Sequence, residues 1–133
     1  MDVGDKRIGM AVSDALGWTA QGIDTLVRRS NQYDKEFVKN ILEQYQPQKI
    51  VVGLPKNMNG SLGPQGEKVK AFADKLQDYY NGEIVFWDER LTTVSAHKAM
   101  IEADMSRKKR KQRVDQVAAV LILQSYLDYL NRK

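Results

Sequence analysis

Hydrophobic and polar positions follow two different periods along this chain, and the first stretch has the period of strands. Residues 7–13 favour β-structure and lie between two runs of turn-forming residues, at positions 4–6 and 14–17. Residues 18–27 have a looser strand pattern, and Asp2 falls on or beside a strand that precedes the first turn. The opening of the chain therefore predicts an antiparallel meander of three strands.

After the meander, helical and strand-like patterns alternate up to the end of the chain. Apolar residues recur at helical spacing in several segments, whereas two short continuous apolar runs favour buried strands. The predicted helices cover residues 30–45, a segment around 69–80, residues 93–103 and residues 114–130, and the predicted strands cover 49–54 and 83–87. Alternating strands and helices after a meander indicate one α/β domain over residues 1–133, with a mixed sheet flanked by helices.

Composition narrows the class of protein without identifying its chemistry. The 133 residues suffice for one domain with a core, and the chain has no cysteine for disulfides or thiolate metal sites. No apolar run reaches the roughly 20 residues that span a bilayer, and no signal peptide is evident, so we expect a cytoplasmic protein without a membrane partner. The net charge of +4 is compatible with anionic partners.

Three acidic residues have settings that suit catalysis. Asp2 lies at the first strand, Glu89 closely follows the buried strand 83–87, and Asp115 lies in the first turn of the last helix. Open α/β sheets place ligand sites at such strand ends. Each acid also has an ordinary interpretation: a chain-end turn residue, a solvated loop charge, or an acid that favours the dipole of its helix.

Taken together, the three acids fit a metal site. Three carboxylates at one spot repel one another unless a cation neutralises them. Mg²⁺ prefers oxygen ligands and keeps several waters, so a few carboxylates suffice. Two such ions about 4 Å apart can activate water and stabilise the leaving oxygen of a phosphodiester. Since the chain has no cysteine, and its only histidine, His97, is interpreted as a plain helix residue, a zinc site is not expected.

A dense basic run at positions 107–113 has one neutral residue. Like charges at this density repel, so we expect a mobile loop or a frayed helix start directly before the helix with Asp115. Cations beside the acids suit binding to a phosphate backbone, which is largely independent of sequence, although a solvated charge cluster is the ordinary alternative. The candidate contacts are Arg107, Lys108, Lys109, Arg110, Lys111 and Arg113.

The loop at positions 55–64 is rich in turn residues and is a second candidate phosphate contact. It lacks the G-x-x-x-x-G-K-[ST] pattern of a P-loop. In one interpretation its backbone N–H groups and Lys56 touch a phosphate, and in the other it is a surface turn set by Asn59–Gly60. We also expect Asn57 and Arg90 to contact nucleic acid.

Four segments together resemble the RuvX (YqgF) family, described as Holliday junction resolvases and implicated in maturation of the 5′ end of pre-16S rRNA. They are residues 2–14 (DVGDKRIGMAVSD), 52–61 (VGLPKNMNGS), 88–93 (DERLTT) and 114–119 (VDQVAA), in the family's order. The resemblance implies a ribonuclease H-like fold with a mixed five-stranded sheet and helices on both faces, a Mg²⁺ or Mn²⁺ cofactor and a nucleic-acid substrate. By the same motifs, Asp2, Glu89 and Asp115 are the catalytic and metal-binding acids.

The resemblance favours a metal-dependent nuclease that processes the 5′ end of pre-16S rRNA, with a Holliday junction resolvase as the alternative. A resolvase acting on a two-fold symmetric junction would work as a homodimer. The chain departs from the family at its start, because members usually carry several more apolar residues before the first acid, whereas only Met1 precedes Asp2 here. Either the true start lies upstream or the first strand is short.

Two further classes stay open. The pattern Asp2-x-Gly-x-x-x-x-Gly9 also resembles the first phosphate motif of actin-like ATPases and sugar kinases, although those proteins need two lobes and 133 residues supply one. The other class is a nucleic-acid-binding protein without catalysis. Hydrolysis of ATP would favour the former, and binding without metal-dependent cleavage would favour the latter.

Overall fold

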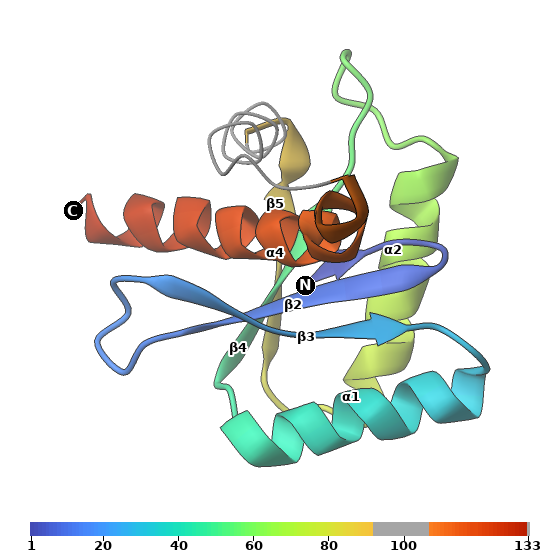
Figure 1. Cartoon of the computed structure of the whole chain (residues 1–133). Coiled ribbons are helices and arrows are strands. Elements are labelled where there is room, and N and C mark those ends of the chain that lie inside the picture. The colour runs from blue at the N-terminus through green and yellow to red at the C-terminus, as the bar shows by residue number, and fades with distance from the viewer. Residues whose placement is uncertain (92–106, 133) are drawn as a thin grey trace.

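The chain folds as a mixed sheet flanked by helices (Figure 1) in the computed structural model, which describes residues 1–91 and 107–132, the side chains of residues 107–116 excepted. The strands are β1 (Asp2–Val3), β2 (Arg7–Ser13), β3 (Ala20–Val27), β4 (Lys49–Leu54) and β5 (Glu83–Asp88). The helices are α1 (Asn31–Tyr45), α2 (Pro64–Gln77) and α4 (Arg107–Asn131), and the 3-10 turn η1 (Glu89–Leu91) follows β5. None of the helices described is long and apolar enough to cross a membrane.

Met1 joins two smaller sheets into one. β1, β2 and β3 form the predicted antiparallel meander, with Asp2 opposite Gly9, and β4 and β5 pair in parallel. The Met1 ammonium nitrogen donates to the carbonyl of Val51 (2.6 Å), and the N–H of Gly53 donates to the Met1 carbonyl (3.0 Å). These bonds align β1 with β4 and give the order β3-β2-β1-β4-β5, so the expected mixed five-stranded sheet is confirmed.

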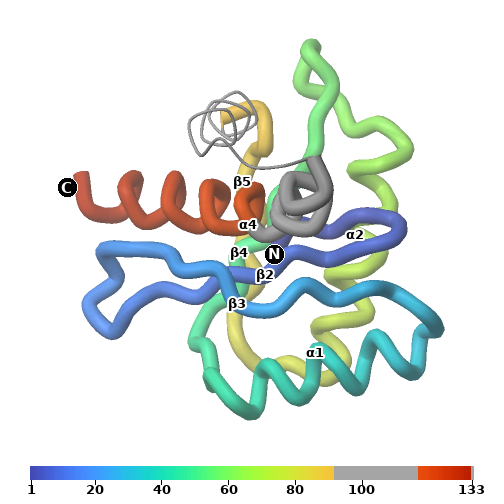
Figure 2. The backbone as a smooth tube through the Cα atoms, in the orientation of Figure 1, coloured from blue at the N-terminus to red at the C-terminus, as the bar shows by residue number. Residues whose placement is uncertain are grey.

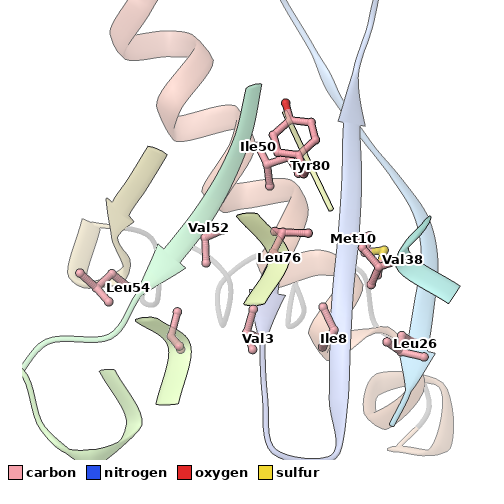
Figure 3. Close-up of a cluster of buried hydrophobic side chains, with 11 residues drawn as sticks. Val3, Ile8, Met10, Leu26, Val38, Ile50, Val52, Leu54, Leu76 and Tyr80 are labelled. Carbon is pink, nitrogen blue, oxygen red and sulfur yellow. The ribbon is translucent and has the colours of Figure 1, made fainter. Parts of the chain in front are cut away.

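The two faces of this sheet have cores of different size. α1 and α2 cover one face, where Val38 and Leu76 pack with buried residues of β1, β2, β3 and β4 (Figure 3). α4 covers the other face with a smaller cluster that includes Val51 and Ile122. Ala119 of α4 is fully buried, and its small side chain lets the helix lie close to the strands. Among the described residues, the sheet therefore has a thickly packed face under α1 and α2 and a more thinly packed face under α4.

Local sequence signals set the helix ends on the thickly packed face. The Ser30 hydroxyl oxygen accepts a hydrogen bond from the N–H of Tyr33 (3.1 Å) and caps α1. α2 starts at Pro64, a position where the missing N–H is not needed. α1 ends before Gln46, which takes the left-handed conformation with φ 44°. The predicted bounds of this first helix are confirmed.

The last helix begins earlier than its hydrophobic pattern predicts. α4 starts at Arg107 rather than at position 114, so the basic run 107–113 is helical and the prediction of a loop was wrong, whereas the alternative of a frayed helix start stays a prediction. Lys, Arg and Gln have high helix propensity, and this preference outweighs the repulsion among their charges. The predicted helix 93–103, with His97, lies outside the described residues.

The third strand begins later than predicted, at Ala20 rather than at position 18. The Asp14 carboxylate accepts hydrogen bonds from the N–H groups of Trp18 (2.8 Å) and Thr19 (3.2 Å). These bonds hold both residues in the turn between β2 and β3, because a short acidic side chain competes with the strand ladder for nearby backbone donors.

A cavity adjoins the start of the first strand, β1. β1 contains two residues, and the N-terminus lies inside the molecule beside β4 (Figure 2). A cavity of about 410 Å³ lies between β2 and β4 next to Met1, and its walls include Met10, Val12, Ile50 and Leu127. The edges of β2 and β4 that face each other here are bridged only at Met1 within the described chain.

Candidate active site

Asp2 and Glu89 come together on the thinly packed face of the sheet. Side chains alternate along a strand, and Val3 belongs to the core beneath α1 and α2, so Asp2 faces α4. Glu89 is the first residue of η1, directly after β5. The two side chains are hydrogen-bonded to each other, and both are half-buried. Residues 87 positions apart in the chain thus meet across the seam between β1 and β4.

Gly53 provides the surface on which the Glu89 side chain lies. A Cβ atom built at Gly53 would be 2.6 Å from Glu89 Oε1 and 2.5 Å from Cδ1 of Ile122 on α4. Neither approach is tolerated between non-bonded atoms, and both atoms are the ends of flexible side chains, so any larger residue would displace the Glu89 carboxylate, the Ile122 side chain, or both. Glycine in the interior of a strand is typical of such a close approach.

The Asp2–Glu89 contact changes the protonation of Glu89. Burial, the hydrogen bond that the protonated Glu89 donates to Asp2, and the negative charge of Asp2 together raise the pKa of Glu89 from 4.5 to about 8. The Met1 ammonium opposes this shift. Its own pKa is lowered from 8.0 to about 6, mainly because it is buried, while Asp2 and Glu89 act to raise it. Without a further cation, the carboxylate pair therefore holds a proton near neutral pH.

Asp88 and Arg90, on either side of Glu89, form a separate ion pair. Two nitrogens of the Arg90 guanidinium contact the Asp88 carboxylate, the shorter distance being 2.7 Å, and this contact lowers the pKa of Asp88. The remaining terminal nitrogen donates to the carbonyls of Asn57 and Met58, at 3.3 Å each. Arg90 thus pairs with Asp88 rather than with Glu89, and it ties the loop after β4 to the end of β5.

The loop after β4 has the structure of a turn. Gly60, with φ 85°, occupies the left-handed region that favours glycine, as the Asn59–Gly60 turn signal predicts. The Asn57 side-chain amide donates to the Ser61 hydroxyl oxygen (3.1 Å). Lys56 is half-buried and close enough to Asp88 to lower the pKa of that carboxyl. Contact of Lys56, Asn57 or Arg90 with a phosphate stays a prediction.

The third predicted acid lies where the structure describes only the backbone. Asp115 belongs to α4, seven residues before Ile122, and its side chain is outside the described part of the chain. The same holds for the side chains of the basic run 107–113. Among the described residues, no group of three or more His, Cys, Asp or Glu side chains is placed to hold a metal. The structure therefore brings together two of the three acids, and the convergence of all three stays a prediction.

Two residues of the site were missed by the sequence interpretation. Gly53 had a visible signal, since it is a glycine inside an otherwise apolar run at 50–54. Met1 had none, because only the folded chain shows its ammonium beside Asp2 and Glu89. Both act by position: Gly53 leaves room for the carboxylate, and Met1 links the strand with Asp2 to β4.

The chemistry of the donor set fits a hard divalent cation. Asp2 and Glu89 supply carboxylate oxygens on one face, and their mutual repulsion is the feature that a cation would relieve. The described residues include no cysteine or histidine, so soft-metal coordination has no ligands there. A site with few protein ligands suits Mg²⁺ or Mn²⁺, which retain bound waters.

Comparison with known proteins agrees with this arrangement of motifs. Residues 1–129 match the RuvX family, described as Holliday junction resolvase. A Clostridium botulinum (strain Hall) protein named "Putative pre-16S rRNA nuclease" is 58% identical over 132 residues, which cover 99% of this chain and 96% of that protein. Proteins of the same name from Clostridium tetani and Clostridium perfringens are 57% and 54% identical, with 100% and 99% of this chain and 96% of each relative covered. The chain belongs to the RuvX family.

Proposed function

We propose that this protein is a divalent-metal-dependent nuclease that hydrolyses phosphodiester bonds in structured RNA, at the 5′ end of pre-16S rRNA. The observation that supports it most is the contact between Asp2 and Glu89, since two carboxylates held together form a set of oxygen donors that suits a divalent metal. The names of the relatives, which are 54% to 58% identical, supply the substrate.

In this proposal Asp2, Glu89 and Asp115 would hold the metal. Seven residues separate Asp115 from Ile122, a spacing that returns to the same face of a helix, and Ile122 lies against Gly53 beside Glu89. These carboxylates would place a Mg²⁺ or Mn²⁺ ion where it would supply Lewis acidity at the phosphate and lower the pKa of the attacking water. The protein's own part is to fix the carboxylates: Gly53 keeps the Glu89 oxygen at its place, and the Met1 bonds fix the strand of Asp2.

The proposed substrate contacts come from two segments, the loop after β4 and the start of α4. Lys56 follows β4, and the basic run 107–113 forms the first turns of α4, the helix that also carries Asp115. Cations along a helix can neutralise several phosphates of a nucleic acid, because the phosphate charges recur every few ångströms along its backbone. Such contacts would position the substrate without reading its sequence.

The second candidate function is resolution of four-way DNA junctions, which the description of the matching family favours. Its chemistry would use the same acids on another branched nucleic acid. A junction has two-fold symmetry, so this function would need two active sites in a homodimer. The two candidates therefore differ in substrate and in assembly, and share the site.

One assay tests the metal site and separates the substrates. We expect Mg²⁺ or Mn²⁺ to support cleavage of a precursor 16S 5′-end RNA, EDTA to abolish it, and a four-way DNA junction to be cut more slowly. Glu89→Gln should lower the rate by more than the roughly 10- to 100-fold typical of losing an outer-shell partner of a metal ligand. Its thermal melting temperature should stay level or rise, because the substitution removes repulsion with Asp2.

Glu83→Gln is the matched control, since it makes the same exchange at the start of the same strand. Glu83 is exposed, 3.8 Å from Lys49, and far along β5 from the acids, so its activity should stay within about twofold of the unaltered protein. Full activity of Glu89→Gln, or cleavage that persists in EDTA, would contradict the proposal. Binding without cleavage would indicate a nucleic-acid-binding protein, and hydrolysis of ATP would indicate the actin-like class.

A further inference from the structure

Met58 is an apolar side chain held almost wholly in water. It is 99% exposed, more than any other large hydrophobic residue in the described part of the chain. It lies in the turn of residues 57–61, here called the Met58 loop, within the green segment that projects away from the sheet in Figure 1. A single exposed apolar side chain is common on a surface. Met58 differs from such a residue in the way its loop is held and in the groups that lie beside it.

The Met58 loop is fixed by its own hydrogen bonds. The N–H of Asn57 donates to the Ser61 carbonyl (2.9 Å), and the N–H of Gly60 donates to the Asn57 carbonyl (2.9 Å). The Asn59 carboxamide oxygen accepts from both the N–H (3.0 Å) and the hydroxyl (2.6 Å) of Ser61. A loop that is ordered in advance presents Met58 in one direction, so little conformational entropy is lost when the side chain meets a ligand.

Arg90 links the Met58 loop to the acids. Its guanidinium donates to the carbonyl of Met58 itself (3.3 Å) and is anchored on Asp88 (2.7 Å), and Arg90 directly follows Glu89 in the chain. The backbone of Met58 is thus one arginine side chain away from the residue that follows Glu89. That reach corresponds to about two or three nucleotides, at roughly 3.4 Å per base step.

We propose that Met58 inserts between two bases of the substrate within a few nucleotides of the phosphodiester held at Asp2 and Glu89. This inference rests on the proposed function and adds to it a residue that selects bent or branched nucleic acid. Methionine is among the apolar residues that proteins wedge between base steps, where they unstack the bases and kink the strand. Its polarisable sulfur also makes favourable contacts with aromatic rings.

A protein partner fits the Met58 loop less well. A stable protein interface buries about 800 Å² on each partner, with an apolar centre. The neighbours of Met58 in the loop are the polar residues Asn57, Asn59 and Ser61. Among the described residues, Arg90 contacts the Met58 carbonyl and pairs with Asp88, and Lys56 precedes the loop. One apolar tip between polar groups, next to cations, suits a stack of bases flanked by phosphates.

Fluorescence of 2-aminopurine measures the proposed insertion directly, because this base analogue brightens when it is unstacked. It would be placed in turn at each nucleotide around the cleavage site of the precursor RNA and around the branch of the four-way DNA junction. The binding partner is Glu89→Gln protein, so that the substrate stays intact. We expect a severalfold rise at one or two adjacent positions, and we expect Met58→Ala in the same background to abolish it.

Affinity and controls complete the test. Losing one base-stacking contact should weaken binding about tenfold, with an unchanged salt dependence because no phosphate contact is lost. Met58→Leu keeps an apolar wedge and should retain the fluorescence rise. Leu16→Ala is the matched control, since Leu16 is 77% exposed in the turn between β2 and β3, away from the acids, and should change neither signal.

The possible outcomes test the insertion of Met58 between bases separately from the proposed nuclease activity. A rise that persists in Met58→Ala, or no rise at any position, would overturn the wedge even if the unaltered protein cleaves the RNA. A rise that depends on Met58, in a protein that cleaves neither substrate with Mg²⁺ or Mn²⁺, would support the wedge and reject the proposed function. Failure to bind either nucleic acid would overturn both. Because Met58 is exposed, melting curves of its variants should match that of the parent protein.

Discussion

Two acids in this protein, one buried and one half-buried, have opposite surroundings. Asp34, on the face covered by α1 and α2, is 7% exposed and accepts hydrogen bonds from Arg28 Nε (3.2 Å) and from the N–H of Arg29 (3.0 Å). Arg28 also donates to the carbonyl of Gly4 (2.9 Å), which ties the turn between β1 and β2 to the start of α1. This carboxylate is matched by a cation of the same chain.

Glu89, on the face covered by α4, has a second carboxylate where Asp34 has an arginine. Its hydrogen-bonding partner is Asp2, and the protein holds the two together although their charges repel. Asp34 therefore serves the fold, whereas Glu89 and Asp2 store an interaction that a bound cation would complete. We therefore expect substitution of Asp34 to lower stability more than activity, and substitution of Glu89 or Asp2 to lower activity more than stability.

The largest expected effect comes from removing the space that Glu89 occupies. Gly53→Ala puts a methyl group against Glu89 Oε1 and Ile122 Cδ1 at once. We expect cleavage to fall about 100-fold, the loss associated with a misplacement of about 1 Å at a reacting centre. Cleavage rates under saturating Mg²⁺, together with Mn²⁺ affinity by calorimetry, provide the measurement.

A second substitution shows whether Gly53→Ala acts by crowding Ile122 in the core or by displacing Glu89. Ile122→Val removes Cδ1 and relieves the steric conflict with α4, while leaving the conflict with Glu89. The double variant Gly53→Ala/Ile122→Val should recover melting temperature but neither Mn²⁺ affinity nor cleavage. Recovery of all three would show that Gly53 matters only for packing.

The next effect concerns the matched acid. Asp34→Asn leaves the Arg28 guanidinium without its anion, and we expect the free energy of unfolding to fall by about 2 kcal/mol, since Arg28 retains partial access to water. Cleavage at a temperature well below the transition should stay within about twofold. Urea unfolding and the cleavage assay test both statements. The control Asp5→Asn removes the exposed pair with Lys68 and should cost less than about 0.5 kcal/mol.

The smallest effect is the pH dependence of stability that Glu89 produces. Its pKa is about 8 in the folded chain and 4.5 in the reference state, so the folded chain binds the proton more tightly. The resulting stability is fully present below pH 4.5 and is lost as the pH rises toward 8. The Met1 ammonium, with its pKa lowered from 8.0 to about 6, contributes in the opposite direction between pH 6 and 8.

The Glu89 contribution therefore shows most clearly between pH 4.5 and pH 6. Over this interval, the difference in unfolding free energy between the unaltered protein and Glu89→Gln should fall by on the order of 1 kcal/mol, discounted for the partial exposure of Glu89. Urea titrations in EDTA across the interval measure the difference. A constant difference would mean that Asp2 and Glu89 do not share a proton. It would contradict the statement that Glu89, unlike Asp34, is held against a second carboxylate.

Much of the architecture could be predicted because its signals are local. Continuous apolar runs predicted β4 and β5. The capping residue Ser30 and the helical spacing of Phe37, Val38 and Ile41 predicted α1. The start of α4 was missed because charge repulsion was weighed above helix propensity. The late start of β3 was missed because the bonds from Asp14 to two backbone N–H groups are not visible in a hydrophobic pattern.

The candidate site could be predicted as a set of residues and not as a geometry. Motifs named Asp2 and Glu89, but the contact between them depends on Met1 bridging β1 to β4, a long-range pairing that no local pattern encodes. Arg90 was expected at the nucleic acid, and the structure shows its guanidinium engaged by Asp88 and by two loop carbonyls. Partners of this kind are decided only when distant segments pack.

The position of Met1 has a practical consequence for handling the protein. Its nitrogen is not at the surface but donates to Val51 beside a cavity between two strands. A purification tag or fluorophore joined ahead of Met1 would enter the sheet next to Asp2 and could alter the property being assayed. The other end of the chain offers a safer attachment point, because Leu130 and Asn131 at the end of α4 are exposed. Labels placed there leave the seam between the two halves of the sheet intact.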